Sequence, residues 1–381
     1  MPPYLKTFRV LLDDNRDVFS SGDEVSGRVI VELSQSFPCK GMQARFIGMV
    51  KVNWSEEIDG RVSQCNAKEM YFDHVVTLLE NDPKKRTGGW NLPSGIHRFP
   101  FRWKLPDRTM PSSYEGKHGH VRYCVRATID LMSGKQLHSK KVFTMTGVVV
   151  DPNKIPNAKA PVYSQALRAQ GCLRCLSRPL SVSVTLRRKA YVPGNIIPIS
   201  VNLEQSKGKI HKIQTYIIQD AKFTAFGSRS GKALNIKRAR EIVTTSTSTG
   251  YDVRNYPVWQ TQMHIPAIPA SGLFGCDFID LQYYVKVEGV LPGDRTRNLI
   301  VEMPICIGSK PLHHLNEAPS LDISPLAKFP SEESLHDEFL AKPQFKLFNR
   351  SISIVDDTDG EDPYGDVEFT PKYAYFSDDD Q

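Results

Sequence analysis

Two cysteines separated by two residues, Cys172 and Cys175, have the spacing of half a zinc site. Structural zinc takes four ligands, and the sequence holds no second cysteine pair with this spacing. His211, His313 or His314 could complete such a site only if the fold brought them close. The same spacing also suits a redox pair or two ordinary thiols in a linker, and we favour two ordinary thiols.

A second segment, Gly227–Ala233, resembles a phosphate-binding loop but is one residue too short, and an alanine stands where a hydroxyl should bind Mg²⁺. We therefore expect a basic loop. Its cations follow one another without an intervening acid: Arg229, Lys232, Lys237, Arg238 and Arg240. Such a cluster suits phosphates or anionic lipid headgroups. The alternative is a mobile, solvated loop.

A third basic set begins on the first expected strand, which carries Lys6 and Arg9. Together with Arg45 or Lys51, these side chains could clamp a phosphate through charge-assisted hydrogen bonds. The alternative is that each is a single cation on the surface.

Short peptide motifs stand near the end of the chain. Two of them have a tyrosine followed three residues later by a bulky side chain, as endocytic adaptors require: Tyr364 with Val367, and Tyr373 with Phe376. A Pro-x-Tyr triplet joins Pro371 to Tyr373. Ser353 and Ser377 each precede acids, a pattern that suits an acid-directed kinase. Such short patterns also arise by chance.

Charge is distributed unevenly along the 381 residues, whose net charge is +7. The segment from Asn316 to Gln381 contains 16 acidic and 5 basic residues, a net of −11, so the rest of the chain carries +18. A basic body indicates anionic partners, such as phosphorylated peptides or lipids. The acidic tail could also fold against the body and mask it, and phosphorylation would strengthen that contact.

Several classes of function find no support in the motifs. The sequence has no Gly-x-Ser-x-Gly, no His-Glu-x-x-His and no glycine-rich dinucleotide loop. We therefore expect no enzyme and no cofactor, and nothing indicates nucleic acid as a partner. The odd number of cysteines, 7, and the absence of a secretory apolar segment near Met1 favour a reducing cytoplasm.

The elements that must position these residues come from a repeated pattern. Phe19-x-x-Gly22-x-x-Val25 recurs as Tyr191-x-x-Gly194-x-x-Ile197, and both are followed by apolar residues at alternate positions. Three further segments match in the same order: Gln43–Ile47 with Gln214–Ile218, Leu105-Pro106 with Ile265-Pro266, and Val121–Arg126 with Leu281–Lys286. The repeat predicts a duplicated β domain. Chance matches between short β patterns are the alternative.

The pattern predicts an all-β fold of two tandem β-sandwiches, since helical periodicity is scarcely visible. We expect an N-domain over 1–150, a linker over 151–178, a C-domain over 179–312 and an acidic, mostly disordered tail over 313–381. One or two amphipathic helical turns could form in 331–340.

Taken in order, these motifs resemble the α-arrestins, the arrestin-domain-containing proteins. The segments that carry the resemblance are Phe19–Val29, Leu105–Tyr123, Asp151–Cys175, Tyr191–Ile199 and Leu291–Leu312. The resemblance implies two immunoglobulin-like sandwiches hinged by a linker. It also implies an adaptor that binds membrane cargo and recruits HECT-type ubiquitin ligases through Pro-Pro-x-Tyr motifs.

One departure from that family concerns the ligase motif. The sequence contains no Pro-Pro-x-Tyr, so direct recruitment of a ligase is doubtful. We expect an intracellular adaptor for cytoplasmic segments of membrane receptors or transporters, working with endocytic adaptors at the plasma membrane and endosomes. The alternative is a peripheral membrane module that binds anionic lipid headgroups through its basic loops.

Overall fold

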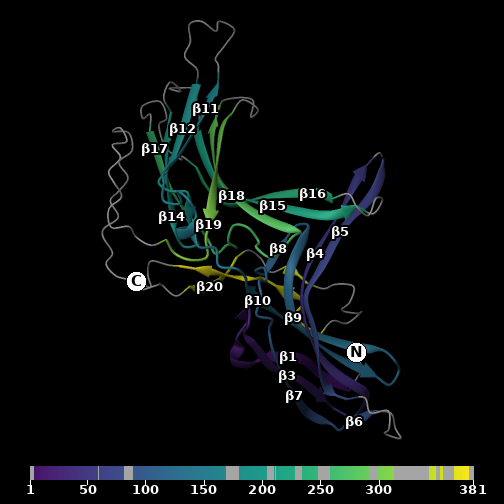
Figure 1. The fold of residues 1–381 in the computed structure, drawn as a ribbon. Coiled ribbons are helices and arrows are strands. Elements are labelled where there is room, and N and C mark those ends of the chain that lie inside the picture. The colour runs from purple at the N-terminus through teal and green to yellow at the C-terminus, as the bar shows by residue number, and fades with distance from the viewer. Residues whose placement is uncertain are drawn as a thin grey trace, which may run out of the picture.

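The computed structural model describes residues 4–58, 60–80, 89–168, 180–203, 210, 212–227, 234–247, 258–291, 298–312, 343–348, 352–354 and 364–376. Within these ranges the chain is nearly all β, with two short 3-10 turns, Asp13–Asn15 and Pro152–Lys154. The predicted fold class, two tandem β-sandwich domains, is confirmed (Figure 1).

The N-terminal sandwich has a three-stranded sheet in the order β1-β3-β7 and a larger sheet whose centre is β5-β4-β9-β10. The two inner faces share one apolar core, to which Phe8, Val29, Phe46 and Val125 contribute. The strands are β1 (Leu5–Leu12), β2 (Val18–Ser20), β3 (Glu24–Leu33), β4 (Phe37–Ile58), β5 (Arg61–Leu79), β6 (Trp90–Leu92), β7 (Gly95–Lys104), β8 (Tyr114–Gly116), β9 (Gly119–Leu131) and β10 (Gln136–Thr146).

The C-terminal sandwich packs a four-stranded sheet, in the order β11-β12-β14-β17, against β13-β19-β18-β15. Its core includes Val184, Ile199, Ile217 and Val285. The strands are β11 (Val162–Arg168), β12 (Leu180–Leu186), β13 (Ala190–Tyr191), β14 (Ile196–Asn202), β15 (Lys212–Gly227), β16 (Leu234–Thr247), β17 (Val258–His264), β18 (Ile279–Val290) and β19 (Leu299–Ile307). Strand β11 lies within the expected linker and pairs with β12.

The repeat in the sequence corresponds to equivalent structure. Gly22 and Gly194 both have positive φ, +81° and +100°, which an L-residue adopts only with strain. In each domain the glycine N–H donates to a carbonyl at the Leu105-Pro106 or Ile265-Pro266 segment. The buried hydroxyls of Tyr123 and Tyr283 donate to the carbonyls of Pro111 and Pro269, at 2.7 and 2.8 Å.

The two sandwiches are joined by a continuous sheet. Residues Phe226 and Gly227 of β15 pair with Asn66 and Cys65 of β5, so the strands of both domains run on into each other (Figure 1). On the inner side of β15, Phe223 belongs to the same apolar cluster as the N-terminal core. A shared core and a shared sheet therefore fix the two domains together.

One segment of the C-terminal domain differs from the sequence interpretation. The expectation of a basic loop was wrong for Lys237, Arg238 and Arg240, since Leu234–Thr247 form β16 along β15. The alternation that marks a strand is hard to see there because only one side chain of β16 is buried.

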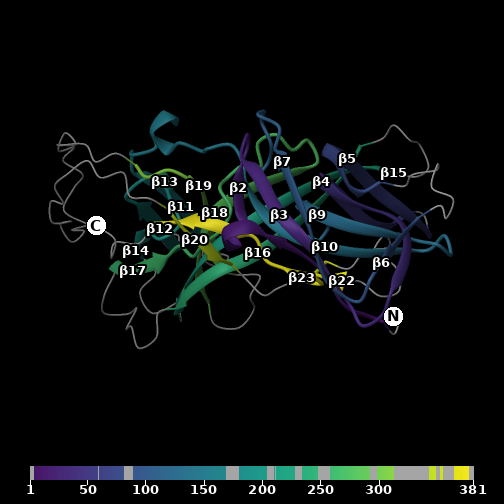
Figure 2. The same cartoon turned by 90° about the horizontal axis from the view of Figure 1, so that it is seen from below.

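The described parts of the tail form a β-hairpin rather than an irregular chain. Strands β20 (Gln344–Leu347) and β21 (Ile352–Ser353) run antiparallel to β24 (Lys372–Tyr375) and β23 (Glu368–Phe369). The short strand β22 (Tyr364–Gly365) adds to β10 in parallel. Figure 2 shows these yellow strands lying along the N-terminal domain and reaching toward β14 and β17. The described residues contain no helix long and apolar enough to cross a membrane.

Candidate functional site: the surface that holds the tail

The tail binds the edge of β10 through its backbone. Ser139 and Lys140 pair with Tyr364 and Gly365, and the Asp366 N–H donates to the carbonyl of Lys140 at 2.8 Å. Gly365 has φ +88°, and a Cβ at this position would lie 2.3 Å from the same carbonyl oxygen. Glycine is therefore required for so close an approach.

Side chains add to this backbone pairing. The Asp366 carboxylate accepts the N–H of Val142 at 3.0 Å and forms an ion pair with Lys141 at 3.1 Å. Lys140 is only 5% exposed, and its ammonium donates to the carbonyl of Ile354 at 2.6 Å. A cation that is buried by the tail must find its acceptors there, so the tail completes the environment of Lys140.

An apolar patch lies beneath the tail on the outer face of the large sheet. Ile47, Cys124 and Val142 form a cluster with Ile354, which is 1% exposed, and Phe369 packs against them. Apolar side chains on the outer face of a sheet normally contact water. Here the tail covers them, and the burial of apolar area stabilises the docked hairpin.

The last described residues of the tail reach the C-terminal domain. The Phe376 N–H donates to the carbonyl of Pro193 at 3.0 Å, and the Tyr375 hydroxyl lies 2.8 Å from Nε2 of His264. Between the domains, the ammonium of Lys372 lies 2.7 Å from Oδ2 of Asp17. The hairpin therefore contacts both sandwiches.

Tyr373 is a buried aromatic side chain of the hairpin, with 9% of its surface exposed. Burial raises its pKa well above the ordinary value, and the nearby Tyr114, Tyr283 and Glu115 raise it further. These neighbours come from both domains, so Tyr373 fills a space between them. Its hydroxyl is kept in the neutral, protonated form.

The structure places the predicted tail motifs within this docked hairpin. Tyr373 and Phe376 are buried, as is Pro371, whereas Val367 and Ser353 are exposed. The ring of Tyr364 packs at 5.7 Å from that of Phe8. A protein that reads either tyrosine motif in extended form would first have to displace the tail. Ser377 lies outside the described residues.

The residues of the predicted phosphate clamp are not brought together. Arg9 lies between the inward-facing Phe8 and Val10 of β1 and so points out from the small sheet, whereas Arg45, beside the inward-facing Phe46, points out from the large one. Arg45 already donates to Asp73 with two nitrogens, which lowers the pKa of that carboxyl. Lys51 is on the large sheet, like Arg45, and Lys6 is exposed on β1.

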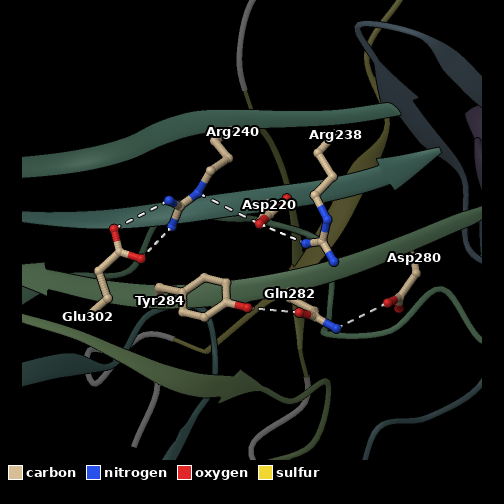
Figure 3. A network of polar contacts seen from close by, with 7 residues as sticks. All are labelled: Asp220, Arg238, Arg240, Asp280, Gln282, Tyr284 and Glu302. Atoms are coloured by element: carbon tan, nitrogen blue, oxygen red, sulfur yellow. Dashed lines mark hydrogen bonds and ion pairs between the residues drawn. The ribbon is translucent and has the colours of Figure 1, made fainter. Parts of the chain in front are cut away.

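The basic residues of β16 are largely neutralised (Figure 3). The Asp220 carboxylate, which is buried, lies 3.0 Å from Arg238 and 3.7 Å from Arg240. Arg240 also donates to Glu302, at 3.0 and 3.3 Å, and stacks over the ring of Tyr284. Lys237 is the third cation of this strand, while Arg229 and Lys232 lie outside the described residues.

The cysteine pair also falls outside the described part of the chain, as do His211, His313 and His314. Among the described residues, no group of three or more His, Cys, Asp or Glu side chains could hold a metal ion. The described cysteines, of which Cys39, Cys65 and Cys124 are buried, form no disulfide with one another.

Comparison with known families agrees with the duplicated architecture. Residues 8–151 match the family described as arrestin (or S-antigen), N-terminal domain, and residues 176–312 match the corresponding C-terminal domain. The chain belongs to the arrestin family. Within it, this α-arrestin resembles human arrestin domain-containing protein 4, with 28% identity over 79% of this chain and 71% of the relative.

A second human relative is the thioredoxin-interacting protein, which is 27% identical over 80% of this arrestin and 75% of its own length. The mouse arrestin domain-containing protein 4 is 29% identical over 79% of this chain and 71% of its own length.

The sequence interpretation did not identify Asp17, Lys140, Lys141 and His264, the residues that hold the tail. Only the adjacent cations Lys140 and Lys141 gave a signal, and nothing in the sequence tied them to Asp366.

Proposed function

We propose that this arrestin is a non-enzymatic cytoplasmic adaptor that binds cytoplasmic segments of membrane receptors or transporters and directs their endocytosis or sorting. The family membership supports the general role of adaptor or scaffold. The localisation that follows is cytoplasmic, with recruitment to the plasma membrane and endosomes.

The observation that carries this proposal is an extended peptide already seated on β10. The surface offers backbone hydrogen bonds, an apolar patch, Lys141 for an acidic side chain and Lys140 for a backbone carbonyl. Adding a strand to a sheet edge is a common way to bind a peptide, because the backbone provides affinity and side-chain contacts provide selectivity. A cytoplasmic segment of similar chemistry would compete with the tail for this surface.

Proximity labelling in cells tests the proposal. The full chain should label membrane and endosomal proteins. A full-length Asp366→Lys variant, which loses the contacts to Lys141 and to the Val142 N–H, should label more of them, since its tail competes less. Asp380→Lys has the same change of charge near the end of the sequence and serves as a control. Absence of membrane and endosomal neighbours for all three chains would refute the adaptor role.

Ubiquitination is the finer part of the proposal. The sequence offers Pro161-Val-Tyr163 and Pro371-Lys-Tyr373 but no Pro-Pro-x-Tyr, so a HECT-type ligase would have to bind a weaker motif or act through another adaptor. Co-precipitation of such a ligase with the full chain, abolished by Tyr163→Ala but not by Tyr216→Ala, would support direct recruitment. Retention of the ligase by every such variant would argue for an indirect route.

A further inference from the structure

The outer face of the three-stranded sheet contains a shallow hollow of about 250 Å³. Alternation along the strands sends Phe8, Val29 and Phe101 into the core and leaves Arg9, on β1, and its neighbours on the outer side. Figure 1 shows β1, β3 and β7 at the end of the molecule opposite β11, β12 and β17. The hollow therefore lies away from the C-terminal sandwich.

Three arginines from three strands surround this hollow. Arg9 of β1 and Arg98 of β7 both pair with Ile30 of β3, one on each side, and Arg28 lies two residues before Ile30 on the same face. Ile30 is only 8% exposed despite its outward position. Its neighbours' aliphatic stems can cover it while their guanidinium groups stay at the surface. The floor is thus apolar and the rim is cationic.

Among the described residues, the three arginines around the hollow lack the close carboxylate partners that other arginines of this protein have. Arg45, Arg238 and Arg240 each contact a carboxylate. Within the described part of the chain, the side chains of Arg9 and Arg98 form no hydrogen bond or ion pair, and the ion pair of Arg28 is with Asp13 at 3.8 Å. Glu32, at one end of the hollow, accepts a hydrogen bond from Thr7 at 3.1 Å. Three guanidinium groups held on one face repel one another, and a multivalent anion would relieve that repulsion.

The chemistry of the rim favours phosphate. Guanidinium groups bind phosphate oxygens in a two-pronged manner that a lysine cannot reproduce. Neighbouring strands lie about 4.8 Å apart, so the backbones of β1 and β7 are about 10 Å apart across Ile30. That span suits a headgroup with more than one phosphate better than a single phosphate ion.

The surface is a sheet face, and this decides between a lipid and a peptide. The strands satisfy each other's backbone groups by pairing in the order β1-β3-β7, so the face offers a peptide side-chain contacts but no ladder of hydrogen bonds. Beside the arginines, Ile96 is 53% exposed. An apolar side chain next to cations on an open face is suited to the interface of a membrane.

We propose that Arg9, Arg28 and Arg98 form a binding site for a membrane lipid whose headgroup carries several phosphate monoesters. This site is independent of the cargo surface on β10, because it lies on the opposite sheet of the sandwich. It would hold the N-terminal domain against the cytoplasmic leaflet and would add to whatever attraction cargo provides.

Vesicle co-sedimentation with the full chain tests this site. The vesicles contain phosphatidylcholine alone, with phosphatidylserine, or with phosphatidylinositol bisphosphate at equal total charge. We expect binding to be tightest to the bisphosphate vesicles and to be reduced about 30-fold in Arg9→Gln/Arg98→Gln, since each cation near a membrane surface contributes about fivefold. Arg9→Lys/Arg98→Lys should recover only part of the loss, because it restores charge but not the two-pronged geometry.

The control is Arg45→Gln/Arg240→Gln, which removes the same charge from arginines outside the three-stranded sheet. It should bind within about twofold of the parent, because neither arginine lines the hollow. An equal loss in control and test variants would overturn the proposal, as would equal binding to phosphatidylserine vesicles. Displacement by free inositol phosphates at similar affinity would show a soluble phosphate site instead of a lipid site. Proximity labelling of cargo is measured in a separate experiment. Failure of the lipid-binding proposal would therefore leave the adaptor proposal standing, and the reverse also holds.

Discussion

Lys372 and Asp17 form an ion pair at 2.7 Å although 355 residues separate them in the chain. Asp17 directly precedes β2, the strand that ends the large sheet, and Lys372 begins β24 of the tail hairpin. The pair thus ties the last part of the sequence to the first. Its position next to Tyr373 makes it a natural point at which to test how firmly the tail is held.

We expect Lys372→Ala to weaken tail docking by about 0.5–1 kcal/mol, which is typical of a partly exposed ion pair. Hydrogen exchange of the peptide spanning 364–376 would report the change as a loss of protection. The charge-swapped double variant Asp17→Lys/Lys372→Asp should recover most of it. If neither single nor double substitution alters exchange, the pair contributes nothing to docking.

A second prediction uses the two matched glycines. Gly194→Ala places an alanine at a backbone φ of +100°, and its Cβ would lie 1.9 Å from the carbonyl oxygen of Phe376. Gly22→Ala has a similar strain, with φ +81°, but its Cβ meets only Asp107 at 3.4 Å. Both should destabilise their domains by about 1–3 kcal/mol. Only Gly194→Ala should also increase hydrogen exchange at the end of the tail, and equal exchange in both variants would contradict the docked position of Phe376.

A third prediction concerns access to the tyrosine motif of Tyr373 and Phe376, which are 9% and 7% exposed. A synthetic peptide spanning 368–381 should bind an endocytic adaptor that reads such motifs, whereas the full chain should bind weakly. Asp366→Lys should raise binding of the full chain toward that of the peptide, because it loosens the tail. Calorimetry or surface plasmon resonance would measure this. Tight binding by the unmodified full chain would show that docking does not block the motif.

A fourth prediction concerns pH and the contact between the domains. The imidazole of His118 packs against Phe223 of β15 at 5.5 Å, and burial, with help from Lys117 and Lys237, lowers the pKa of His118 below 6.5. A lowered histidine pKa means that the unfolded chain binds the proton more readily. The contribution of neutral His118 to the free energy of unfolding is therefore fully present above about pH 6.5, the ordinary pKa of a histidine. It is lost as the pH falls below that value.

Thermal unfolding between pH 7.5 and 5 would reveal this effect as a falling midpoint. His118→Phe should keep the aromatic contact and flatten the profile in this range. His97, a half-buried histidine on β7 that contacts Phe99, supplies the control, since His97→Phe should leave the profile unchanged. A parent profile that is already flat would exclude His118 as a source of pH dependence.

The sequence by itself determined the duplicated architecture. Gly22 and Gly194 with their flanking apolar residues, and Tyr123 and Tyr283, are local signals that repeat at corresponding places, and the structure gives each pair the same role. Alternation and turn residues are short-range properties, so they are legible without knowing which strand lies beside which.

The tertiary structure alone decided which charges are free and which are used. Asp220 neutralises Arg238 because β15 and β16 pair in one register, and Arg9 and Arg45 diverge because their strands belong to opposite sheets. The tail showed only an acidic composition, which gives no register and no partner. Its docking on Lys140 and Asp17 depends on side chains that distant strands bring to one surface, and that arrangement exists only once both sandwiches have folded.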